Sequence, residues 1–212
     1  MQVPESTTKK LGLWLVVLFV PAYLNDFAYA IITGASGAIV LDYGYRLFVV
    51  AVFAFVPELR KLVERNWRPT VVWWRVALWI AGALVVSLFG YKRIEWYGDL
   101  WAGFWHYIKP LAAPPAWLRQ FDLWIGLPAV AVTEELVGRV LFLEVARRYS
   151  IPSIVVVLLS SVVFALAHWG GGGGSVLATF VAGIVLMVVY LKTGSFVPCV
   201  IVHWAIDFQY YW

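Results

Sequence analysis

Long apolar runs separated by short polar or basic segments constrain the fold of this chain more than any other feature of its sequence. A helix needs about 20 apolar residues to cross the hydrocarbon core of a bilayer, and several of the runs approach that length. We therefore predict an all-α, polytopic integral membrane protein, a helical bundle of about seven transmembrane helices. The expected membrane helices lie within residues 11–33, 43–57, 70–90, 121–149, 152–168, 175–191 and 196–212.

The composition supports a membrane protein and argues against a nucleic-acid-binding one. The chain is 63% hydrophobic and 13% charged, whereas soluble domains are about half apolar and one quarter charged. A net charge of +4 would suit a nucleic-acid partner. The Lys and Arg residues gather between the apolar runs, however, which is the topological pattern of membrane proteins. We therefore expect the lipid bilayer, and no nucleic acid, as a partner.

We expect a single membrane domain with two parts in sequence. Residues 1–120 should supply N-terminal transmembrane helices, with a basic loop at residues 58–69 and an aromatic segment at residues 91–119 that lies in the headgroup layer. Residues 121–212 should form a catalytic core of four helices, the first of which is started or kinked by Pro128.

The distribution of basic residues predicts which side of the membrane each segment faces. Cytoplasmic segments of membrane proteins carry an excess of Lys and Arg. This excess is obtained when the N-terminus lies in the cytoplasm. The basic residues that then face the cytoplasm are Lys9, Lys10, Arg60, Lys61, Arg65, Arg68, Arg147, Arg148 and Lys192, and those that face outside are Lys92, Arg93, Lys109 and Arg119.

Charged residues stand within the apolar run 121–149, at Glu134, Glu135 and Arg139. A charged side chain at the centre of a membrane helix costs about 2.5–3.5 kcal/mol on insertion scales, so such groups usually face a cavity or a partner. Glu135 and Arg139 have the spacing and order of a favourable i, i+4 ion pair. Adjacent helical residues point about 100° apart, so this pair leaves Glu134 free for chemistry. The alternative is a structural ion cluster that ties helices together.

Two of the three histidines also lie within apolar helices. His168 ends its helix just before a run of glycines, residues 170–174, which should break the chain and let another backbone approach closely. His203 and Asp207 lie one turn apart on one helical face. The third histidine, His106, lies in the aromatic segment and is expected to be a boundary residue.

Two other readings of these residues remain open. Glu134, His168, His203 and Asp207 are donors that suit zinc, so they could form a metal site. Cys199 stands four residues before His203, and a Cys–His nucleophile pair is conceivable. A lone cysteine in a membrane helix is more often a small packing residue.

The motifs Glu-Glu-x-x-x-Arg, Phe-x-x-x-His and His-x-x-x-Asp follow one another within residues 121–212. In this order they resemble the CAAX protease and bacteriocin-processing family of intramembrane proteases, also called the Abi family. The resemblance implies a glutamic-type endopeptidase that needs no cofactor. It implies that Glu134 and His168 activate the attacking water and that His203 and Asp207 stabilise the oxyanion, with Glu135 and Arg139 in support.

Asp207 departs from the better-studied members of that family, which have asparagine at this place. An ionised aspartate would repel an oxyanion. Asp207 must therefore carry a proton, or orient His203 instead. A metal-dependent version of the protease is the alternative.

The resemblance also implies a substrate class, a membrane-anchored polypeptide cut near the point where it emerges from the bilayer. The minimal loops favour a C-terminal sorting tail in a prokaryotic plasma membrane. If the helix begins at Pro128, Glu134 lies about 9 Å from its outer end, which predicts an active site toward the outer leaflet. The competing functions are a non-catalytic immunity or partner-binding protein of the same fold and a transporter with a proton relay.

Overall fold

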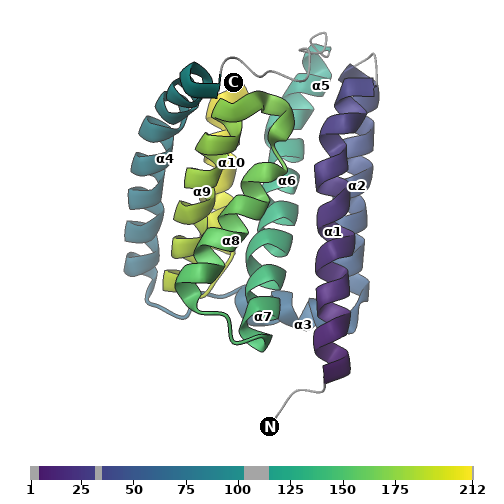
Figure 1. Cartoon of the computed structure of the whole chain (residues 1–212), viewed down its shortest axis with the longest axis vertical. Coiled ribbons are helices and arrows are strands. Elements are labelled where there is room, and N and C mark those ends of the chain that lie inside the picture. Colours follow the sequence, from purple (N-terminus) through teal and green to yellow (C-terminus); the bar gives the residue numbers. More distant parts are fainter. Residues whose placement is uncertain (1–4, 32–34, 103–114, 212) are drawn as a thin grey trace.

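The computed structural model describes residues 5–31, 35–102 and 115–211, and this part of the chain contains helices and short turns but no strand. The prediction of an all-α fold is thereby confirmed for the described residues. Most helices run along the long axis of the molecule, and α3 crosses one end of it (Figure 1). The elements are α1 (Glu5–Ile31), α2 (Ala35–Phe55), α3 (Pro57–Asn66), α4 (Trp73–Ala102), α5 (Ala116–Phe121), η1 (Asp122–Gly126), α6 (Leu127–Glu135), η2 (Leu136–Leu141), α7 (Phe142–Arg148), α8 (Ser153–Leu166), η3 (Trp169–Gly171), α9 (Gly172–Thr193) and α10 (Val197–Tyr211).

The described helices include clear candidates for membrane spans. Three are long and apolar enough, within Ser6–Asn25, Trp73–Leu100 and Trp169–Thr193, and there are four if the bent pair α2–α3 counts as one span. Helix α8 is apolar but shorter. Large apolar side chains such as Leu47 and Phe89 are exposed on the outside of the bundle, as a lipid-facing surface requires. In its described residues this membrane protein is all-helical and has three to four candidate spans, and the predicted number of about seven stays a prediction.

Residues 58–69 were expected to form a basic loop, and most of them form α3 instead. Helix α3 turns by 92° from the axis of α2. Leu59 and Leu62 are buried on one face, while Arg60 and Lys61 are exposed on the other. Such an amphipathic helix suits the plane of the membrane surface. The expectation of a loop was wrong, because Leu59 and Leu62 have the i, i+3 spacing of apolar residues in an amphipathic helix.

The basic end of the bundle is formed by segments that are far apart in sequence. The start of α1, helix α3, the end of α7 and the turn between α9 and α10 all lie at one end, opposite the C-terminus (Figure 1). Lys10 binds Glu58 at 2.7 Å, and Arg65 binds Glu144. The basic residues predicted to face the cytoplasm belong to these segments or adjoin them.

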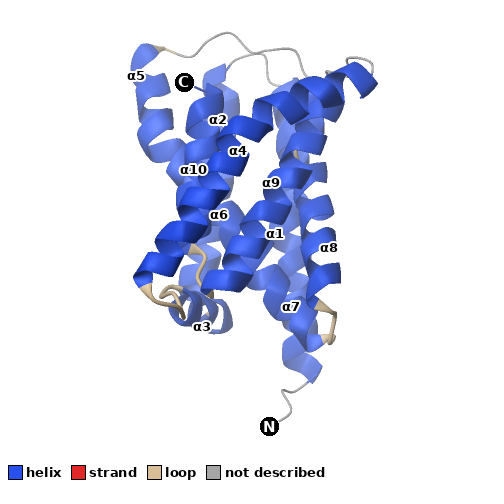
Figure 2. Cartoon of the chain, turned by 90° about the vertical axis from the view of Figure 1, so that its left-hand side faces the viewer, coloured by secondary structure: helices blue, strands red, loops and turns tan. Residues whose placement is uncertain are grey.

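The predicted aromatic segment at residues 91–119 is wrong as far as Ala102, because α4 continues without a break past Gly90. Helix α4 lies along α9 and α10 (Figure 2). The Tyr91 hydroxyl lies 3.2 Å from Thr179 Oγ1 on α9. Packing against α9 and α10 therefore extends α4 through the charged residues after Gly90, where the sequence suggested that the helix ends. Residues 103–114, which include His106 and Lys109, lie outside the described residues.

The glycine run only partly breaks the chain. The break lies at η3, and Gly172 has a φ of 87° that favours glycine. Gly172–174 already belong to the first turn of α9. A Cβ on Gly174 would lie 2.3 Å from the Glu95 carbonyl oxygen and 2.3 Å from Asp99 Oδ1, both on α4. Gly174 therefore allows α4 and α9 to pack closely where they cross.

The helix that carries the glutamates begins earlier than expected. From Ala116 to Arg148 the elements α5, η1, α6, η2 and α7 follow one another without a loop. Pro128 stands in the first turn of α6, just after the π-helical turn η1. Because the helical run does not start at Pro128, Glu134 lies further from the start of the run than the expected distance of about 9 Å. The side of the membrane that the site faces stays a prediction. The positions predicted for α8, α9 and α10 are confirmed to within a few residues.

Candidate active site

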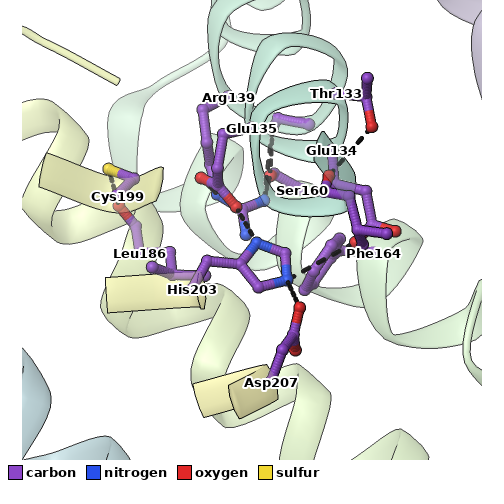
Figure 3. Close-up of polar contacts among 12 residues, drawn as sticks. Thr133, Glu134, Glu135, Arg139, Ser160, Phe164, Leu186, Cys199, His203 and Asp207 are labelled. Atoms are coloured by element: carbon purple, nitrogen blue, oxygen red, sulfur yellow. Dashed lines mark hydrogen bonds and ion pairs between the residues drawn. The ribbon is translucent and has the colours of Figure 1, made fainter. Parts of the chain in front are cut away.

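The structure brings the three motifs together in the interior of the bundle. Glu134 and Glu135 end α6, and the π-helical turn η2 follows at once with Arg139 inside it. His203 and Asp207 come from α10, which packs against α6. Figure 3 shows the His203 ring pointing between the two glutamates and Asp207. Single π-helical turns inside α-helices occur frequently at functional sites, because they change the direction of the side chains that follow.

The predicted ion pair between Glu135 and Arg139 is confirmed. Arg139 Nε lies 3.1 Å from Glu135 Oε2, and both side chains are 0% exposed. Arg139 also donates from its Nη1 to Ser160 Oγ at 3.3 Å, and its guanidinium carbon lies 4.6 Å from the centroid of the Phe164 ring. The arginine is therefore held by a carboxylate, a hydroxyl and an aromatic face.

Glu135 has a second partner that the sequence reasoning missed. Its Oε1 lies 2.9 Å from His203 Nδ1. A carboxylate beside one ring nitrogen fixes the orientation of a histidine and favours a proton on that nitrogen. The Nε2 atom of His203 then faces Glu134 Oε2 at 3.7 Å and Asp207 Oδ2 at 3.5 Å. The i, i+4 rule paired Glu135 with Arg139 and did not account for its second oxygen.

Glu134 is not free, contrary to the prediction. Its Oε1 lies 2.8 Å from Nη1 of Arg46, a residue of α2 in the N-terminal half. Its Oε2 is buried and has no hydrogen-bond donor among the described residues. Asp42 and Arg46 have the same i, i+4 spacing inside an apolar helix as Glu135 and Arg139. That spacing was a signal in the sequence that could have found Arg46.

His168 lies at the end of α8, where the helix gives way to η3. Its Nδ1 lies 3.0 Å from the Phe164 carbonyl oxygen, which leaves Nε2 for chemistry. Phe164 also separates the two histidines, with its ring centroid 5.0 Å from that of His168 and 5.6 Å from that of His203. His168 is near enough to Glu134 for their charges to interact. No hydrogen bond or ion pair between the two is found in the described structure.

Cys199 is buried away from this chemistry. Its thiol lies 3.3 Å from the Leu186 carbonyl oxygen and 3.9 Å from that of Ser195. Figure 3 shows the sulfur on the Leu186 side, away from the His203 ring. This arrangement supports a packing role and gives no support to a Cys–His nucleophile pair.

The donors named for a possible metal site do not form one in the described part of the chain. There, no group of three or more His, Cys, Asp or Glu side chains is placed to hold a metal ion. Glu134 Oε1 is occupied by Arg46, and His203 Nδ1 is occupied by Glu135. Glu134 Oε2 and His203 Nε2 are not taken up by these contacts, and the metal-dependent alternative stays a prediction.

Comparison with known protein families agrees with this geometry. Residues 115–209 match the family model described as Rce1-like, type II CAAX prenyl endopeptidase Rce1-like. The matched segment contains all three motifs, including Glu134, His168 and His203. Comparisons with curated proteins and with solved structures found no match. Residues 115–209 are therefore similar to the CAAX prenyl endopeptidase family, in agreement with the resemblance of their motifs.

Proposed function

We propose that the chain is a glutamic-type intramembrane endopeptidase that hydrolyses a peptide bond in a membrane-anchored polypeptide. The observation that carries this proposal is the buried Glu134 Oε2, which lacks a hydrogen-bond donor among the described residues and faces His203 Nε2 at 3.7 Å. A carboxylate oxygen in that position can accept a proton from water. The similarity of residues 115–209 to a protease family supports the same reaction.

In the proposed reaction, Glu134 and His168 activate the attacking water. Its oxygen bonds to the carbonyl carbon of the scissile peptide, and one of its protons passes to Glu134 Oε2. The carbonyl electron pair moves onto its oxygen and forms an oxyanion. When the tetrahedral intermediate collapses, the C–N bond breaks and the proton passes to the leaving amine.

His203 and Asp207 are proposed to stabilise that oxyanion. His203 Nε2 can donate to it when the ring carries both protons, and the bond from Nδ1 to Glu135 stabilises the resulting imidazolium. Asp207 can donate only in its protonated form. A net negative set of carboxyl groups in a low-dielectric interior favours such a proton, because unpaired buried charge is costly.

Replacing Asp207 tests this assignment. We expect Asp207→Asn to keep activity within about tenfold of the wild type, because the amide donates a hydrogen bond as a protonated carboxyl does. Asp207→Ala should lower kcat by roughly 10²–10³, the usual cost of one oxyanion donor. Initial rates of peptide cleavage would measure both. Equal losses in the two variants would show that the charge of Asp207 is needed, and that it does not act as a donor.

The reaction itself is tested with the purified full chain in liposomes of prokaryotic lipids. One reporter would carry a single C-terminal membrane helix, a second a prenylated C-terminus, and a third would be soluble. We expect cleavage of the first reporter at a bond close to its membrane helix, located by mass spectrometry of the fragments. If only the prenylated reporter is cleaved, a prenylated protein replaces the sorting tail as the proposed substrate. Cleavage of none would contradict the protease function and favour a non-catalytic partner-binding role.

The absence of a cofactor is part of the proposal and has its own test. We expect cleavage in the liposome assay to withstand o-phenanthroline and EDTA, because the proposed base is Glu134 rather than a metal-bound water. The matched control is the non-chelating isomer m-phenanthroline. Loss of activity with the chelator only, and recovery with zinc, would establish the metal-dependent alternative.

The proposed location is a prokaryotic plasma membrane with the basic end of the bundle in the cytoplasm. The positive-inside rule supports this orientation, since the N-terminus, α3 and the end of α7 share that end. The side of the liposome membrane on which the reporter fragments are released would then show which side of the membrane the active site faces.

A further inference from the structure

Arg46 lies in α2, far from the matched segment 115–209, and yet contacts the proposed general base. We propose that Arg46 is a positioning residue that holds Glu134 ionised and oriented for catalysis, so that the active site requires the N-terminal helices. The inference rests on the proposed function, because it assigns a role in the same reaction.

The contacts of Arg46 occupy all three of its nitrogen atoms. Its Nη1 lies 2.8 Å from Glu134 Oε1 and 3.3 Å from Thr133 Oγ1. Its Nε and Nη2 lie 3.1 Å and 3.0 Å from Asp42 Oδ1. The side chains of Arg46 and Asp42 are only 9% and 10% exposed. A planar guanidinium can bridge two carboxylates in this way, whereas an ammonium is a single point charge.

The charge of Arg46 offsets a surplus of acidic groups around Glu134. Glu135 is the next residue in the chain, and Asp207 on α10 faces His203 Nε2, the nitrogen that Glu134 also faces. An ionised Glu134 in such surroundings would be unfavourable without a nearby cation. The titratable and charged groups that bear on Glu134 are Asp42, Tyr45 and Arg46 from α2, Glu135 and Arg139 from its own helical run, His168 after α8, and His203 and Asp207 from α10.

The contact also selects which oxygen of Glu134 is reactive. Arg46 binds Oε1, and Oε2 is left facing His203 Nε2 at 3.7 Å. A base must present its free oxygen to the water that it deprotonates, so this fixed orientation is what a positioning residue contributes. Asp42, one turn earlier on α2, holds the guanidinium in place from the other side.

The chain offers a matched control for a purely structural role. Arg65 on α3 also pairs with a carboxylate of the C-terminal half, Glu144 on α7, but at the basic end of the bundle. Both arginines tie the N-terminal helices to the helical run of Glu134. If Arg46 merely ties helices together, Arg46→Met and Arg65→Met should have similar effects on activity.

The test measures kcat, KM and their pH profiles for the wild type, Arg46→Met, Arg46→Lys and Arg65→Met in liposomes with the tail-anchored reporter. We expect Arg46→Met to lower kcat at neutral pH by roughly 10²-fold, the lower end of what a positioned base contributes, with little change in KM. Without the cation the carboxylate forms only at higher pH, so the acid limb of the profile should move upward. Arg46→Lys should restore part of kcat, and Arg65→Met should keep the wild-type profile.

Each outcome decides a separate claim. If the wild type cuts no reporter, the proposed function fails. If the wild type cuts and Arg46→Met has the same kcat and profile, or a higher kcat, the positioning role is overturned while the protease stands. A loss in Arg46→Met that is equal at every pH and matched by Arg65→Met would also overturn it, because a tie between helices would then suffice.

Discussion

Replacement of Glu134 by glutamine is expected to lower kcat for peptide cleavage by about 10²–10⁴, the range that a positioned general base contributes. Glutamine keeps the size of the side chain and can still accept a hydrogen bond from Arg46, which donates to Oε1 at 2.8 Å. It cannot accept the proton of the attacking water. KM should change little, because the proposed role of Glu134 is proton transfer rather than substrate binding. Single-turnover rates with the tail-anchored reporter would measure the effect.

The matched control for Glu134→Gln is Glu144→Gln. Glu144 lies on the same helical run, is also buried and is also paired with arginines, namely Arg65 and Arg148. Its loss should reduce stability at the basic end and leave kcat near the wild-type value. Wild-type cleavage by Glu134→Gln would remove Glu134 from the mechanism and, with it, the glutamic-type assignment.

The sequence predicted the helices of the C-terminal half and the pair Glu135–Arg139 because each depends on neighbours along the chain. Apolar runs set helix positions, and an i, i+4 spacing sets an ion pair. The contact of His203 with Glu135 depends instead on how α10 packs against α6. Local periodicity contains no information on such packing, so this contact was not predicted.

The errors of the sequence reasoning have the same physical origin. Charges near residue 92 suggested a helix end, but contacts of α4 with α9 carry the helix on to Ala102. The glycine run was expected to break the chain, but Gly172–174 belong to α9 because Gly174 packs closely against α4. Arg46 had a visible signal in its spacing from Asp42, although only the fold places it against Glu134.

Replacement of Arg139 by methionine should be the most destabilising change in the site. Glu135 is 0% exposed and would lose the cation that lies 3.1 Å from it. Removing one partner of a buried ion pair typically costs about 3–5 kcal/mol, because the remaining charge is left uncompensated. Thermal or denaturant unfolding of the purified protein in one detergent would measure the loss. Arg148→Met is the matched control, since its partly exposed pair with Glu144 should contribute less.

The double variant Arg139→Met with Glu135→Gln separates stability from catalysis. Removing both charges of a buried pair avoids the unpaired carboxylate, so most of the lost stability should return. Activity should stay low, because His203 Nδ1 would face a neutral amide in place of the carboxylate that lies 2.9 Å away. The imidazolium that is proposed to donate to the oxyanion would then lack its stabilising charge. Full recovery of both stability and kcat would show that Glu135 serves the fold alone, and that His203 needs no charged partner to act.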